Sequence, residues 1–108
     1  MRELLYVFPL GNIHISVYSD DDLIRTTDCE GLFLPDPDGY KIILDGNLEP
    51  ELWGQVFVHE VLEAACTLGE IDLPHNQLQT LAVLLAQAFA ITGDFTEDDE
   101  VEVDGPLN

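Results

Sequence analysis

The sequence predicts an α+β domain in which a small antiparallel β-sheet, built by a hairpin-rich N-terminal half, packs with two C-terminal helices. Apolar and polar residues alternate strictly over residues 12–18, which is typical of a half-buried strand. The segment Pro35-Asp36-Pro37-Asp38-Gly39 separates two further apolar runs and predicts a hairpin turn. Apolar residues recur at helical spacing in the second half of the chain. Strands therefore come first and helices follow.

Four strands are expected along the first half. Residues 4–8 form a short apolar run that ends at Pro9 and Gly11, and residues 12–18 form the alternating strand that follows. The alternation puts Ile13, Ile15 and Val17 on one face. Residues 23–28 fit neither helix nor strand clearly. Residues 31–34 and 40–44 are the two strands of the hairpin.

Two helices are expected in the second half. Pro50, flanked by Glu49 and Glu51, suits a helix start, so the first helix should cover about residues 50–68 and stop at Gly69. The second helix should cover about residues 75–92. Its apolar residues are spaced for one buried stripe: Leu78, Leu81, Ala82, Leu85 and Phe89. Residues 1–93 form a single domain, and the acidic residues 94–108 are expected to form a flexible tail.

The net charge of the chain disfavours some classes of binding partner. The 108 residues hold 22 Asp and Glu against 3 Lys and Arg, a formal net charge of -19. Direct binding to nucleic acid or to an anionic membrane surface needs clustered cations, so both are disfavoured. Attraction to a metal ion or to a basic protein surface remains possible. The same charge favours a soluble monomer.

The chain shows neither a secretory signal nor a membrane span. The opening residues lack a small-residue cleavage site, and the longest apolar stretch, residues 78–91, is too short and too polar to cross a bilayer. The two cysteines, Cys29 and Cys66, are expected to be free thiols in a cytoplasm.

The first predicted helix carries the strongest chemical signal. His59 and Glu63 are one helical turn apart, so an imidazole nitrogen and a carboxylate can converge on one metal ion beside the helix. Glu60 follows the first of these ligands, in the position where the Glu of an H-E-x-x-H motif accepts a proton from water. The pattern here is H-E-x-x-E. A solvated acidic helix face would show the same residues, so spacing alone is a weak signal.

The wider context resembles the small zinc-metallopeptidase-like proteins encoded by phages and prophages. The resemblance spans roughly residues 31–91 and is carried by a glycine, an aliphatic strand, a Pro-Glu helix start, the H-E-x-x-E helix and the start of the next helix. These segments are Gly31, Tyr40-Lys41-Ile42-Ile43-Leu44-Asp45, Leu48-Glu49-Pro50-Glu51, Val56-Phe57-Val58-His59-Glu60-Val61-Leu62-Glu63-Ala64 and Leu73-Pro74-His75-Asn76-Gln77-Leu78.

The resemblance implies a zinc-dependent peptidase or related hydrolase located in the host cytoplasm. It implies His59, Glu63 and His75 as metal ligands and Glu60 as the catalytic general base. The family often has an acid about one turn further along the second helix, where this chain has Ala82. A site that binds metal without efficient catalysis is therefore an alternative.

Other interpretations of these residues stay open. His75 also fits a solvated helix start, His14 a surface position on a strand, and Cys66 a small buried thiol rather than a ligand.

The acidity supports a second function, that of a DNA mimic. Such a protein presents carboxylates in place of phosphates to a basic nucleic-acid-binding protein, for example a host defence nuclease in an anti-restriction or anti-CRISPR role.

Overall fold

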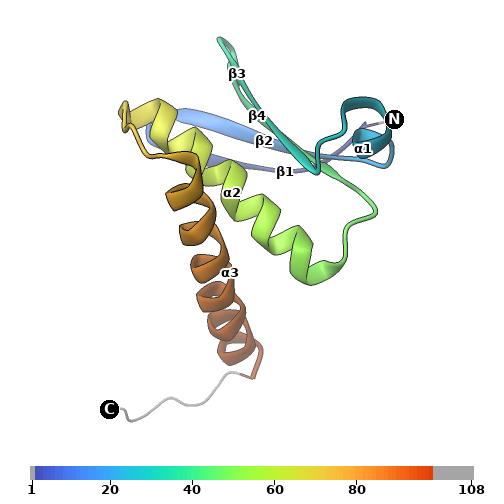
Figure 1. The fold of residues 1–108 in the computed structure, drawn as a ribbon, viewed down its shortest axis with the longest axis vertical. Helices are drawn as coiled ribbons and strands as arrows, with labels where there is room; N and C mark the ends of the chain where they lie inside the picture. Colours follow the sequence, from blue (N-terminus) through green and yellow to red (C-terminus); the bar gives the residue numbers. More distant parts are fainter. Residues whose placement is uncertain (1, 99–108) are drawn as a thin grey trace.

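The computed structural model describes residues 2–98 and contains a four-stranded sheet and three helices (Figure 1). The N-terminal half supplies all four strands and one short helix, and two long helices follow. In chain order the elements are β1 (Arg2–Leu10), β2 (Ile13–Asp20), α1 (Leu23–Thr27), β3 (Gly31–Asp36), β4 (Gly39–Asp45), α2 (Pro50–Gly69) and α3 (His75–Asp98). The predicted α+β class is confirmed.

The sheet is mixed and not wholly antiparallel, which corrects the sequence-based expectation. Its strand order is β1-β2-β4-β3, with antiparallel pairs β1/β2 and β3/β4 and a parallel central pair β2/β4. The ambiguous segment after β2 contains the short helix α1, which lets the chain cross to the far edge before β3 begins. The hairpin then returns β4 beside β2, so these two strands run in the same direction.

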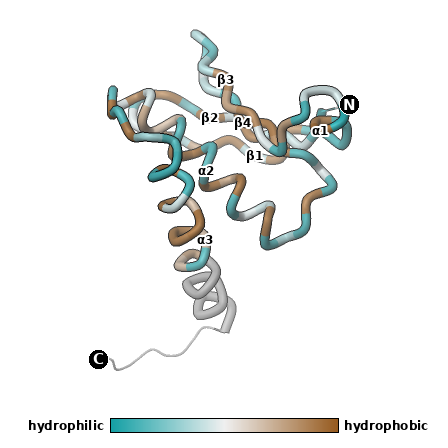
Figure 2. Tube along the Cα trace, viewed as in Figure 1, coloured by the Kyte–Doolittle hydropathy of each residue, from teal (hydrophilic) through white to brown (hydrophobic). Residues whose placement is uncertain are grey.

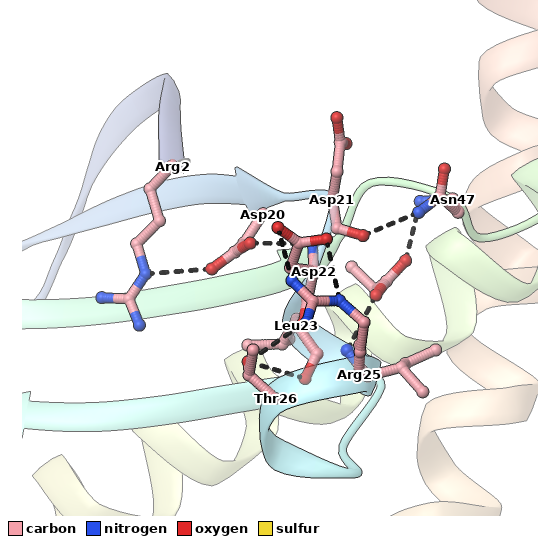
Figure 3. A network of polar contacts seen from close by, with 10 residues as sticks. Arg2, Asp20, Asp21, Asp22, Leu23, Arg25, Thr26 and Asn47 are labelled. Carbon is pink, nitrogen blue, oxygen red and sulfur yellow. Dashed lines mark hydrogen bonds and ion pairs between the residues drawn. The ribbon is translucent and has the colours of Figure 1, made fainter.

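A polar network anchors α1 at the end of this parallel pair (Figure 3). Asp20 and Asp45 are register partners at the ends of β2 and β4, and both are buried. Asp20 accepts a hydrogen bond from the backbone N–H of Asp22 at 2.9 Å and one from Arg2 at 3.3 Å. These contacts, the backbone bond first, hold the pKa of Asp20 below its usual value. Asp45 accepts the backbone N–H of Ile24 at 2.9 Å. Both carboxylates therefore have structural partners.

The core lies between one face of the sheet and α2. The alternation predicted for β2 is confirmed, since Ile15 and Val17 are fully buried. Ile42 and Leu44 of β4 and Ala64 of α2 complete the buried cluster. This packing places α2 across the sheet. The face of α2 that points away from the sheet contacts α3.

Both long helices begin where the sequence predicts, and α2 also ends at the predicted position, whereas α3 ends later. The helix α2 ends at Gly69, and its left-handed C-cap is Glu70, whose N–H reaches the carbonyls of Cys66 and Thr67. The helix α3 continues through Asp98 instead of stopping near Thr92. Residues 99–108 of the predicted tail lie outside the described part of the chain.

Only part of the predicted apolar stripe of α3 is buried. Leu78 and Ala82 are 2% and 0% exposed, but Leu81 and Phe89 are 41% and 59% exposed. The two helices meet near the loop that joins them and then diverge (Figure 1), so part of the apolar stripe of α3 is left uncovered. None of the helices in residues 2–98 combines the length and apolarity needed to span a bilayer.

Candidate metal centre

Two long helices bring three potential metal ligands together. His59 and Glu63 lie one turn apart on α2, and His75 is the first residue of α3. The Nε2 atom of His59 is 3.4 Å from Oε2 of Glu63, and the Nδ1 atom of His75 is 3.9 Å from the same oxygen. One ligand atom from each residue lies within 4.8 Å of the other two. The structure therefore places all three sequence-predicted ligands around one point.

The donor set suits zinc. Two imidazoles and one carboxylate are a common ligand combination for catalytic zinc. In a tetrahedral site with metal–ligand bonds of about 2.0–2.1 Å, ligand atoms are roughly 3.3 Å apart. The 3.4 Å separation of His59 and Glu63 already matches this value. The His75 side chain, which is 75% exposed, has room to close the remaining gap.

Gln79 orients the imidazole of His59. The Nδ1 atom of His59 lies 2.6 Å from Oε1 of Gln79, which is on α3 one turn after His75. With the amide oxygen of Gln79 as acceptor, this contact favours the tautomer that carries its proton on Nδ1. The lone pair of the neutral ring is then on Nε2 and faces the Glu63 carboxylate.

Glu60 is buried beside these ligands. It is only 8% exposed, so it does not belong to a solvated acidic helix face. Burial, and secondarily the negative charge of Glu63, raise the pKa of Glu60 to about 7. Gly31, the first residue of β3, makes room for it, because a Cβ there would lie 3.1 Å from Oε2 of Glu60.

A cavity of about 200 Å³ opens at this site. Residues before and at the start of β3 form one wall, and the two long helices form the others. Its lining includes Glu30, Gly31, Gln55, Val56, His59, Glu60, His75 and Gln79. The candidate ligand His59 and the buried acid Glu60 therefore line the same solvent-accessible space.

The structure also shows which of the other candidate residues lie outside the group of metal-ligand atoms. His14 is exposed on β2, and neither His14 nor Cys66 belongs to the cluster of ligand atoms found in the described residues. Both cysteines are free thiols. Gln79 is not among the residues predicted from the sequence, although its position four residues after His75 on the same helix was a usable signal.

Searches against protein-family models, curated proteins and solved structures find no match to this chain. The geometry of His59, Glu63 and His75 therefore carries the functional conclusion.

Proposed function

We propose that this protein is a zinc-dependent hydrolase of the peptidase type. His59, Glu63 and His75 hold the metal, and Glu60 is the general base. The observation that carries the proposal is the convergence of three ligand atoms from two helices within 4.8 Å. Three protein ligands leave one position of a tetrahedral zinc ion for water or substrate, which is the arrangement of catalytic sites.

The residues around the cluster have distinct roles in this proposal. A bound zinc ion supplies Lewis-acid activation of water and of a substrate carbonyl. Glu60 accepts a proton on its carboxylate, and its burial beside the cavity keeps that carboxylate directed at the site. Gln79 holds His59 with Nε2 directed toward the metal position.

The resemblance to phage- and prophage-encoded zinc-metallopeptidase-like proteins supports the peptidase class. It rests on the helix bearing His59, Glu60 and Glu63 and on His75 at the start of the next helix. In this chain α2 follows the β3/β4 hairpin and α3 follows α2 directly.

Metal binding is the first test. Protein purified without chelator is analysed for metal, and zinc binding to the metal-free protein is measured by calorimetry. We expect one zinc per chain, with binding lost in His59→Ala and retained in His14→Ala, a control that removes an exposed histidine outside the cluster. Binding that is unchanged by His59→Ala contradicts the proposed site.

Catalysis is the second test. Zinc-loaded protein is incubated with fluorescein-labelled casein, and Glu60→Gln is compared with the unmodified chain. We expect Glu60→Gln to keep one zinc per chain and to lose at least 100-fold in cleavage rate, because general-base catalysis contributes about 10²–10⁴-fold. Stoichiometric zinc binding without cleavage supports the alternative of a metal site that is not catalytic.

A further inference from the structure

A groove lies between α2 and α3 on the side where the two helices diverge. Gly54 of α2 and Ala86 of α3 line two adjoining hollows of about 320 Å³ and 330 Å³. A Cβ added to Gly54 would meet no atom within 4 Å, so the helices do not touch at this point. We call this feature the α2–α3 groove and define it by Pro50, Gly54, Phe57, Ala86 and Phe89.

Exposed apolar groups line the inner part of the groove. Phe89 is 59% exposed, although its position in the sequence predicts a buried side chain. Phe57 borders the same hollow and stacks on Trp53 with ring centroids 5.3 Å apart. Apolar residues from both helices therefore line the groove. Apolar segments of α2 and α3 are brown in Figure 2. An apolar hollow that is open to solvent between two helices is a candidate binding site.

The negative charge around the groove favours a positively charged binding partner. Lys41 is the last of the 3 basic residues, so no Lys or Arg follows in the part of the sequence that builds both helices. Glu51 lies on the rim of the groove. With a net charge of -19, two copies of this chain repel each other, whereas a cationic partner is attracted.

We propose that the α2–α3 groove binds an amphipathic helix of another protein, with apolar residues toward Phe57 and Phe89 and Lys or Arg on the flanking positions. A helix lying in a groove between two helices buries an i, i+3, i+4, i+7 set of apolar side chains, and the small residues Gly54 and Ala86 permit close approach. The groove contains none of the candidate metal ligands, although Gln55 lines both its outer hollow and the cavity at the metal centre. The proposal holds whether or not metal binds.

The probe is a fluorescein-labelled 18-residue peptide made of Leu and Lys, with Leu at helical spacing on one face. Two peptides are the controls: a scrambled sequence of the same composition, and a version with Glu in place of Lys. Binding is followed by fluorescence anisotropy at about 150 mM salt, and by emission of Trp53, which is the only tryptophan of the chain. We expect saturable binding of the Leu/Lys helix and at least tenfold weaker binding of both controls.

Two substitutions test whether the peptide binds in the α2–α3 groove. Gly54→Leu fills the groove from a position with open space around it, so the fold should tolerate the change, which circular dichroism checks. Phe89→Ser removes the exposed aromatic ring. We expect each variant to bind the Leu/Lys peptide at least tenfold more weakly. Ile71→Ser is the matched control, because Ile71 is 58% exposed but lies in the loop between the helices.

Three results would overturn the proposal. Equal binding of the scrambled peptide would show that charge alone attracts the partner, as in a DNA mimic. Unchanged binding by both Gly54→Leu and Phe89→Ser would place the interaction elsewhere. A dimer of the free protein that Phe89→Ser dissociates, measured by analytical ultracentrifugation at micromolar concentration, would make a second copy the occupant.

Discussion

The Nδ1 atom of His59 on α2 lies 2.6 Å from the Oε1 atom of Gln79 on α3. Four residues before Gln79, His75 brings its own imidazole to within 3.9 Å of the Glu63 carboxylate. The first turns of α3 therefore supply both a candidate metal ligand and the group that orients another. A metal ion held by His59, Glu63 and His75 would tie α2 to α3 at this point.

The contact between His59 and Gln79 predicts that Gln79→Ala weakens zinc binding by about 10–100-fold, because outer-shell partners fix the ligand tautomer. Gln79→Glu should retain most of the affinity, since its carboxylate also accepts from Nδ1. The measurement is zinc calorimetry on both variants. The matched control is Gln77→Ala, which removes an exposed glutamine from the same helix.

The tautomer of His59 gives a test that does not depend on zinc. Nitrogen NMR of the metal-free protein should show the proton of the neutral ring on Nδ1 in the unmodified chain and a mixture of tautomers in Gln79→Ala. An unchanged tautomer in Gln79→Ala would refute the orienting role. If the tautomer changes in Gln79→Ala but neither this variant nor the unmodified chain binds zinc, the orienting role of Gln79 stands and the metal proposal is contradicted.

Zinc should raise the melting temperature if it binds the native chain selectively. At a free zinc concentration 100 times the Kd, the gain in the free energy of unfolding is about 2.7 kcal/mol. For a domain of this size we expect an increase of roughly 10 °C or more, reversed by EDTA. His75→Ala should remove most of the increase, because it lacks one of three ligands. An EDTA-insensitive melt of the zinc-loaded chain would contradict this prediction.

Glu60 should make the metal-free protein less stable as pH rises. Burial raises its pKa from 4.5 to about 7, so the native state binds more protons than the unfolded state between these values. The free energy of unfolding should therefore fall across pH 4.5–7, by roughly 3 kcal/mol for this group.

Glu60→Gln provides the comparison for this pH effect. The variant has no proton to lose at this position, so its stability should lack this decrease and should exceed that of the unmodified chain at pH 8. Urea unfolding at pH 5 and pH 8 in the presence of EDTA measures both proteins. Equal pH slopes for the two would show that Glu60 is already ionised in the native state.

Two glycines should respond in opposite directions to alanine. A Cβ at Gly31 would lie 2.6 Å from Cγ1 of Val56 and 3.1 Å from Oε2 of Glu60, so Gly31→Ala should destabilise the fold by about 1–3 kcal/mol. Gly54→Ala places a methyl group in open space within a helix and should stabilise the protein by about 0.5–1 kcal/mol. Thermal melts of the two variants test both signs. Equal effects would contradict the close packing of Gly31 on the candidate site.

Local periodicity was sufficient to predict the α+β class and the face of α2 that carries the candidate site. Alternation over residues 12–18 corresponds to the buried Ile15 and Val17, because side chains alternate between the two faces of a strand. The spacing of His59 and Glu63 likewise places them together, since residues four apart are neighbours on any α-helix.

Contacts between distant segments were decided only by the tertiary structure. The sequence alone could not place β4 parallel to β2, because that pairing depends on how α1 redirects the chain. It could not show that Glu60 is buried against Gly31 or that Gln79 reaches His59, since each contact joins different elements. The exposure of Phe89 has the same origin: periodicity defines an apolar stripe on a helix, but the crossing of α2 and α3 decides how much of that stripe is covered.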